Sequence, residues 1–176
     1  MAIIVSAYPG CGKSYFYKKY SVYCKTKNTA MLDLDNDISR TLKILDSDSS
    51  KFSWIYDENG KKTDERNPEF PMNYIQHIKD HLIKEDIIFI SSHDNVRELL
   101  QKEEIPYILV YPERNARTEW INRFIKRGNP KDFVEFQEKM WDTFIDGMED
   151  DPSPYKICLK GNEYLEDVED KLLHFT

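Results

Sequence analysis

The residues that point most directly to chemistry lie near the start of the chain, where residues 7 to 14 read Ala-Tyr-Pro-Gly-Cys-Gly-Lys-Ser. This octapeptide departs from the phosphate-binding pattern G-x-x-x-x-G-K-[ST], the P-loop, only at Ala7, where the pattern begins with glycine. In such a loop the backbone N–H groups form a nest for anions, the lysine reaches the β- and γ-phosphates, and the hydroxyl binds Mg²⁺. Lys13 and Ser14 are therefore expected to hold a nucleoside triphosphate and its metal ion.

The context that this motif requires is present on both sides of it. Residues 2–6 are an apolar, β-branched run typical of a buried strand, and residues 13–25 carry apolar side chains at a spacing compatible with a helix. Without that context a Gly-Cys-Gly-Lys segment would be only a turn. Ala7 lacks the freedom of a positive φ and little else, so phosphate binding is still expected. The predicted donor-binding residues are Pro9, Gly10, Cys11, Gly12, Lys13, Ser14 and Tyr15.

Composition limits the class of protein. The chain has 176 residues, a formal net charge of -7 and three cysteines at irregular spacings, and its sequence pI is about 5.2. The length favours a single domain over residues 1–176, and the acidity argues against an extended nucleic-acid surface. The cysteines indicate a reducing compartment, and no signal peptide or membrane span is expected. We therefore expect a cytoplasmic protein, a monomer or a homodimer, with a small-molecule substrate.

The elements that must position the P-loop alternate between strands and helices. Apolar runs predict strands at residues 29–35, 86–91, 105–111 and 155–159, besides the one before the P-loop. Helical patterns follow at residues 38–45, 71–82, 95–103, 114–127, 131–148 and 164–173. This alternation predicts a three-layer α/β/α fold with a five-stranded parallel sheet. Ligands of such sheets bind at the carboxyl ends of the strands.

Residues 46–70 interrupt the alternation and are predicted to be an inserted loop or small hairpin turning at Asn59-Gly60. They are also the best candidate for recognising an acceptor molecule. Ser50 offers a hydrogen bond, and Phe52, in preference to Trp54, offers a face for stacking on a base. The alternative is that these aromatic side chains form the hydrophobic underside of the loop.

Arginines late in the chain suggest phosphoryl transfer, because a transferring phosphoryl group needs cations over it. Arg123 and Arg127 are four residues apart, share a helical face and precede a Gly-Asn-Pro segment, so we assign them the catalytic role. For Arg114 and Arg117 ion pairing on a solvated helix is preferred. The chain carries no Asn/Thr-Lys-x-Asp motif, which argues against a GTPase of the usual kind.

Two further arginines are placed to hold an acceptor. Arg40 lies on the predicted helix after the second strand, and Arg97 lies on the helix after the third. Both helices begin at the edge of the sheet that carries the P-loop. We expect the two side chains to bind an acceptor phosphate, although surface ion pairing is the common fate of an arginine.

This set of features resembles the P-loop nucleoside and nucleotide kinases, in particular the adenylate kinase-like group. The resemblance rests on the P-loop, on Arg40 and Arg97, and on an R-x-x-x-R element at Arg123 and Arg127, where that group carries a mobile lid. Residues 66–71 and 91–129 also look like small phage-type nucleotide kinases. The resemblance implies ATP and Mg²⁺ as cofactors, acceptor-phosphate binding by the first pair of arginines, donor-phosphate contacts by the second, and lid helices at residues 114–148.

The chain departs from that group after the third strand. An Asp-Gly-x-Pro-Arg run is replaced by residues 91–97, so the carboxylate that orders the waters on Mg²⁺ is missing there. Asp33 or Asp35, at the end of the predicted second strand, can substitute. In P-loop kinases that phosphorylate hydroxyl groups an aspartate at that strand end is the general base, and Asp35 fits this description. Either carboxylate can instead simply cap the next helix.

The sequence thus predicts an ATP-dependent phosphotransferase, in the first place a (deoxy)nucleoside monophosphate kinase. Catalysis is assigned to Lys13, Arg123, Arg127 and Asp35, and the metal to Ser14. Acceptor binding is assigned to Asp33, Arg40, Ser50, Phe52 and Arg97. The first alternative is a kinase with a hydroxyl acceptor, such as a polynucleotide 5′-end, a nucleoside or a small metabolite, that uses Asp35 as base. The second is an ATP-binding regulatory module without activity.

Overall fold

A five-stranded parallel sheet forms the centre of the protein. The computed structural model describes residues 1–27 and 42–173, and the strand order is β2-β5-β1-β6-β7 with every pair parallel. The strands are β1 (Ile3–Ala7), β2 (Ile44–Asp46), β5 (Ile87–Ser91), β6 (Ile108–Pro112) and β7 (Lys156–Leu159). The strand order reverses around β1, which places the expected ligand crevice at its carboxyl end, where the P-loop follows.

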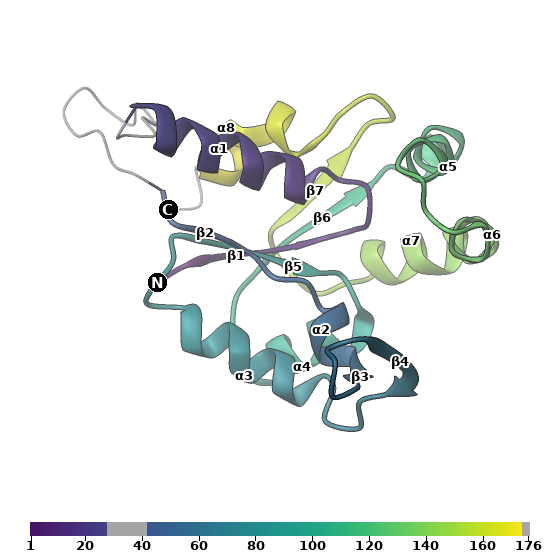
Figure 1. The fold of residues 1–176 in the computed structure, drawn as a ribbon. Helices are drawn as coiled ribbons and strands as arrows, with labels where there is room; N and C mark the ends of the chain where they lie inside the picture. The colour runs from purple at the N-terminus through teal and green to yellow at the C-terminus, as the bar shows by residue number, and fades with distance from the viewer. Residues whose placement is uncertain (28–41, 174–176) are drawn as a thin grey trace.

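Helices cover both faces of the sheet (Figure 1). Helices α1 (Lys13–Lys27) and α8 (Glu169–Leu173) lie over one face, and α3 (Met72–His81) and α4 (Asp94–Lys102) lie under the other. Burial on both faces explains why Ile87 to Ile90 of β5 are continuously apolar and no more than 1% exposed. The predicted three-layer α/β fold with a five-stranded parallel sheet is confirmed.

The remaining elements extend beyond the carboxyl ends of the strands (Figure 1). On one side lie α5 (Arg117–Lys126) and α6 (Lys131–Lys139), joined to the core by α7 (Trp141–Glu149). On the other side lie α2 (Ser50–Ser53) and an antiparallel hairpin of β3 (Trp54–Tyr56) and β4 (Lys62–Arg66). Two 3₁₀ turns, η1 (Arg114–Ala116) and η2 (Leu165–Val168), precede α5 and α8. The predicted inserted hairpin is therefore present.

One strand of the sheet, β2, lies where the end of a helix was expected. The prediction of a helix over residues 38–45 is wrong at its end, because Ile44, Leu45 and Asp46 form β2 and pair with Ile87, Ile88 and Phe89 of β5. A short apolar run such as Ile44-Leu45 does not distinguish a helix end from a buried strand by its periodicity. The strand predicted over residues 29–35 lies outside the described residues.

The expected helix over residues 131–148 is divided in two. Met140 leaves the helical conformation, with φ -94° and ψ 5°, and separates α6 from α7. The break lets Trp141, Ile145 and Met148 of α7 turn into the core, where each is no more than 2% exposed. Within the described ranges no helix combines the length and the apolar character that crossing a membrane requires.

Candidate active site

The P-loop connects β1 to α1 through two glycines in the left-handed region. Gly10 has φ +86° and Gly12 has φ +97°. A Cβ on Gly10 would lie 3.0 Å from Trp120 Nε1 and 3.1 Å from Phe124 Cε1, so glycine is required there both by conformation and by space. Ala7, the departure from the motif, is the last residue of β1 and has an ordinary strand conformation. Alanine therefore fits at that position without strain.

Three successive carbonyl groups of the loop are held from outside. The carbonyl of Pro9 accepts from Trp120 Nε1 at 2.9 Å, that of Gly10 accepts from Arg123 Nη1 at 3.2 Å, and that of Cys11 accepts from the Leu165 N–H at 2.9 Å. The C=O and N–H of a trans peptide point in opposite directions, so these bonds turn the N–H groups of Gly10 and Gly12 toward the other side of the loop, while the N–H of Cys11 donates to the Tyr8 carbonyl at 3.3 Å. The first N–H groups of α1 add further donors without helical partners. The arrangement is a nest for anions.

Lys13 lies at the floor of this nest. Its Nζ donates to the carbonyls of Ala7 at 2.5 Å and Tyr8 at 3.5 Å. Burial lowers the pKa of Lys13, and the carboxylate of Asp46 partly opposes that effect. A half-buried ammonium group whose hydrogen-bond partners among the described residues are carbonyls gains from a phosphate ligand, whose charge offsets its desolvation.

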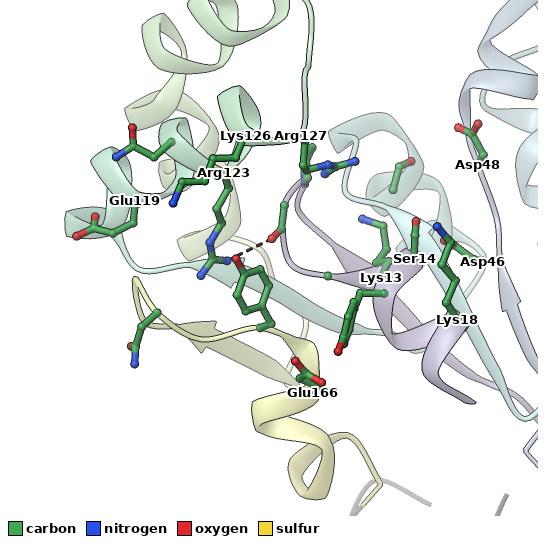
Figure 2. A pocket seen from close by; sticks show the side chains of 18 of the residues that line it. Lys13, Ser14, Lys18, Asp46, Asp48, Glu119, Arg123, Lys126, Arg127 and Glu166 are labelled. Atoms are coloured by element: carbon green, nitrogen blue, oxygen red, sulfur yellow. Dashed lines mark hydrogen bonds between the residues drawn. The ribbon is translucent and has the colours of Figure 1, made fainter. Parts of the chain in front are cut away.

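The loop belongs to a cavity of about 1300 Å³ at the carboxyl ends of the strands. Figure 2 shows Lys13, Ser14 and Arg127 converging on it, with Asp46 and Asp48 on the opposite side from Arg123 and Glu119. Ser14 and Tyr15 are exposed toward it. The lining residues are Pro9, Gly10, Gly12, Lys13, Ser14, Tyr15, Lys18, Asp46, Ser47, Asp48, Ser49, Ser91, Glu119, Asn122, Arg123, Lys126, Arg127, Gly161, Asn162, Tyr164 and Glu166.

Arg123 lines the cavity but is fully engaged by the protein. Besides Gly10 its guanidinium donates to the carbonyls of Gly161 at 2.8 Å and Glu163 at 2.9 Å. It also lies 3.8 Å from the ring centres of both Trp120 and Tyr164. Burial lowers its pKa. The expectation of a mobile lid arginine is corrected for this residue, because these contacts make it a clamp that joins the P-loop to α5 and to the segment after β7.

Arg127 is the arginine left for a ligand on this side. It ends α5, lines the cavity and points toward Lys13 in Figure 2. Its positive charge is among the effects that lower the pKa of Lys13. Within residues 1–27 and 42–173 no carboxylate lies within ion-pair distance of Arg127. The structure thus separates two arginines that the sequence had treated as a pair.

Carboxylates enter the cavity at the end of β2. Asp46 closes the strand and Asp48 follows in the next turn; both act on the pKa of Lys13, Asp46 more strongly. Asp48 accepts from the Ser50 N–H at 2.9 Å and from its hydroxyl at 2.8 Å. Ser47 is 6% exposed, and its Oγ has no hydrogen-bond partner among the described residues. Sequence reasoning missed these carboxylates because it took residues up to Leu45 as a helix, although the apolar pair Ile44-Leu45 directly before Asp46 is also typical of a short buried strand.

The predicted acceptor residues of the insertion do not line the cavity. Ser50 instead positions Asp48. Phe52 packs 5.1 Å from the ring of Tyr74 and 4.7 Å from that of His77, so its predicted role as a stacking face is corrected to a packing role. The ring of Trp54 contacts Lys62 at 3.9 Å and Arg66 at 3.7 Å.

Arg97 is also placed elsewhere. It is 3% exposed and forms ion pairs with Asp94 and Asp151, while further bonds go to the carbonyls of Ser92 at 3.3 Å and Gly147 at 3.2 Å. These contacts join α4 to the segment between α7 and β7. The expectation that Arg97 binds an acceptor phosphate is therefore corrected, because its charge is already neutralised. Asp33, Asp35 and Arg40 lie outside the described residues.

The residues present fit a triphosphate with Mg²⁺. Gly10 and Gly12 allow the left-handed turns of the loop, Ser14 presents a hydroxyl, and Asp46 and Asp48 present oxygen ligands of the kind that Mg²⁺ prefers. No group of three or more histidine, cysteine, aspartate or glutamate side chains in the described ranges is arranged to hold a metal by itself. Such an arrangement suits Mg²⁺ bound together with phosphate oxygens, which needs only one or two carboxylates.

Comparison with models of known protein families gives no match, and comparison with curated proteins gives none either. Among solved structures the chain is similar to a gluconokinase from Sinorhizobium meliloti 1021, with a TM-score of 0.51 and 14% sequence identity. The similarity covers 98% of this chain and 89% of that chain.

Proposed function

We propose that this protein is an ATP- and Mg²⁺-dependent phosphotransferase acting on a small molecule. The observation that carries the proposal is a P-loop in a cavity that also contains carboxylates. The successive carbonyl groups of the loop accept hydrogen bonds from Trp120, Arg123 and Leu165. A loop that only bound phosphate would need no carboxylate across the cavity from it. The fold that the chain shares with a gluconokinase is consistent with this proposal.

The donor half of the reaction falls to the P-loop and α5. The N–H groups of Gly10, Gly12, Lys13 and Ser14 and the Lys13 ammonium would bind the phosphates, and the Ser14 hydroxyl would hold the metal ion together with Asp46. When bound, Mg²⁺ neutralises charge on the donor phosphates. Arg127 lies opposite Lys13 and stabilises the charge of the transferring group. Cys11 contributes only its backbone, because burial raises the pKa of its thiol to about 12.

The acceptor half favours a hydroxyl group as nucleophile. A hydroxyl benefits from a carboxylate within reach, worth about 10²–10⁴ in rate, whereas a monophosphate is already ionised. Asp48 is exposed toward the cavity after β2, so it takes the role of general base that sequence reasoning gave to Asp35. Arg97, one of two arginines needed for a monophosphate, is held in ion pairs.

A (deoxy)nucleoside monophosphate kinase is the second candidate. The observation in its favour is Arg66, an exposed arginine of the hairpin on the acceptor side. The two candidates differ in what they require of Asp48. A hydroxyl kinase loses most of its activity when this carboxylate is removed, and a monophosphate kinase loses little.

The test is ADP formation from Mg-ATP over a panel of acceptors: nucleosides, sugars and sugar acids, 5′-hydroxyl oligonucleotides, and the common nucleoside and deoxynucleoside monophosphates. We expect activity with a hydroxyl acceptor that falls at least about 100-fold in Asp48→Asn. The matched control is Asp132→Asn, which removes an exposed carboxylate on α6, away from the cavity lining. Activity with monophosphates alone, unaffected by Asp48→Asn, would favour the second candidate. Binding of ATP with no acceptor turned over would point to a regulatory module instead.

A further inference from the structure

Among the residues that the structure describes, no arginine lines the acceptor side of the cavity. Arg97 forms ion pairs with Asp94 and Asp151. Arg123 and Arg127, which line the cavity, lie on the donor side. The hairpin next to this acceptor side nevertheless carries an arginine with unused donors. That arginine is Arg66, at the end of β4.

We propose that Arg66, stacked on Trp54, is the anion-binding residue of the acceptor site, and that the acceptor therefore carries a phosphate or carboxylate group apart from its reacting oxygen. The proposal rests on the proposed function and deepens it by naming a property of the substrate. It assigns to the inserted hairpin the recognition of that anionic group.

The hairpin holds Arg66 in a defined place. Trp54 and Arg66 are direct partners across β3 and β4, and the guanidinium carbon lies 3.7 Å from the centre of the indole ring. The N–H of Asn67 donates to the carbonyl of Ser53 at 3.1 Å, which closes the base of the hairpin beside this pair. Stacking orients a guanidinium but leaves the donors along its edge free, so Arg66 is preorganised for a planar anion.

Two cations meet at the ring of Trp54, although residues 54–66 as a whole carry four acidic side chains and three basic ones. Lys62 lies 3.9 Å from the same indole ring, which brings two cations onto one side chain. Asp64 shares their face of β4 by strand alternation, yet within the described ranges no carboxylate lies within ion-pair distance of Arg66 or Lys62. By contrast, Arg97 and Arg114 are bound to carboxylates and Arg117 to the Glu138 carbonyl. Arg66 is thus ready to accept an external anion.

Two connections join Arg66 to the cavity. Ser49, which lines the cavity, immediately precedes α2, and α2 leads directly into Trp54. Ser91, which also lines it, is bonded at 2.9 Å to His93 Nδ1. Partial desolvation lowers the pKa of His93, and the charges of Arg66 and then Lys13 lower it further, so this ring lies within range of both cations. The hairpin stands at the carboxyl edge of the sheet, across from α5 and α6 (Figure 1).

This placement would make the site specific for acceptors that carry an anionic group. The reacting oxygen belongs near Asp48, and the anionic group belongs farther out at Arg66. An acceptor without that group loses a charge-assisted hydrogen bond, which costs about tenfold or more in affinity. The hairpin would therefore select acceptors by their charge and length.

The test compares matched ligands that differ in the anionic group: gluconate with sorbitol, its open-chain neutral counterpart, and thymidine monophosphate with thymidine. Each is titrated into the protein holding Mg²⁺ and a non-hydrolysable ATP analogue, and the indole N–H resonance of Trp54 is followed by NMR. That resonance is assigned as the one lost in Trp54→Phe. The variant is Arg66→Gln, and the control is Lys61→Gln, which removes one charge from the same hairpin without touching the indole.

We expect at least one anionic ligand to shift the Trp54 resonance and to bind about tenfold more tightly than its neutral partner. This preference should vanish in Arg66→Gln and persist in Lys61→Gln. A preference that survives in Arg66→Gln overturns the proposal, and so does the absence of any shift with every anionic ligand. The pair that responds identifies phosphate or carboxylate. Because binding is read without turnover, an inactive enzyme that keeps the preference would contradict the proposed function and leave Arg66 in its role.

Discussion

At the scale of single residues, the positions of the loop between β1 and α1 differ in how strictly they require glycine. Gly10 and Gly12 adopt left-handed conformations, and Gly10 also faces the rings of Trp120 and Phe124 at contact distance. Ala7 differs from the motif but lies in ordinary strand geometry. The motif could therefore be recognised from sequence despite Ala7, because the two glycines that the geometry needs are both present.

Gly10→Ala should destabilise the protein and weaken binding of Mg-ATP. The left-handed conformation alone costs an alanine about 1–2 kcal/mol, and the new Cβ would push Trp120 away from the Pro9 carbonyl. Urea unfolding and calorimetric titration with Mg-ATP measure the two effects. Ala7→Gly is the control and should bind as the natural chain does. Unchanged ATP affinity in Gly10→Ala would contradict this account of the loop.

Arg123 and Arg127 should respond in opposite ways to substitution. Arg123→Lys cannot satisfy three carbonyls and two rings at once, so the free energy of unfolding should fall by about 2 kcal/mol or more. Arg127→Ala should leave stability within about 0.5 kcal/mol and lower kcat by about 10²-fold or more. Denaturant unfolding and steady-state kinetics on the same preparations separate the two roles. Equal effects of the two substitutions on stability would contradict this division of roles between Arg123 and Arg127.

At the scale of elements, the position of β2 decides which carboxylates reach the cavity. The chain offered two short apolar segments, each followed by aspartates, at residues 29–35 and 44–48. Local pattern does not rank them, because pairing with β5 is a long-range choice. The structure shows that residues 44–46 pair with β5, which brings Asp46 and Asp48 to the edge of the sheet. An aspartate at the carboxyl end of this strand was therefore predictable from the sequence, but which aspartates occupy that position was not.

The network around Arg97 should prove structural. Arg97→Met would leave the carboxylate of Asp151 buried and without its cation, which costs about 3–5 kcal/mol. Where the variant is still folded, its KM for the acceptor should equal that of the natural chain. Arg114→Gln removes an exposed arginine with several surface carboxylates and should change stability little. A rise in acceptor KM in Arg97→Met without lost stability would restore the phosphate-binding role.

At the scale of the whole molecule, the sequence was sufficient for the architecture and insufficient for the partners of its arginines. Buried parallel strands carry continuous apolar runs that can be read directly, as in β5 and β6. Whether an arginine binds a ligand depends on residues distant in the chain, such as Gly161 for Arg123 and Asp151 for Arg97. No local pattern contains that information. The roles of the charged residues therefore became clear only from the structure, whereas the apolar residues already indicated their strands in the sequence.

The fold divides the cavity between two bodies. Helices α5 and α6 and the P-loop form one side, joined by bonds from Trp120 and Arg123 and by the Tyr8 hydroxyl, which donates to Gln137 at 2.6 Å. The end of β2 and the turn after it, with Asp46 and Asp48, form the other side, and the β3–β4 hairpin follows α2 beyond that turn (Figure 1). A donor held by the first body and an acceptor held by the second would meet above the end of β1. This geometry is what favours transfer to an acceptor over hydrolysis.

The most direct measurement of the central claim follows the fate of the γ-phosphoryl group of labelled ATP. The protein is incubated with Mg-ATP and the acceptor panel, with Lys13→Met as the inactive reference, and products are identified by mass spectrometry. The account predicts label on a hydroxyl oxygen of one anionic acceptor, in an amount equal to the ADP formed. Label recovered only as inorganic phosphate, or no ADP above the Lys13→Met reference, would contradict it.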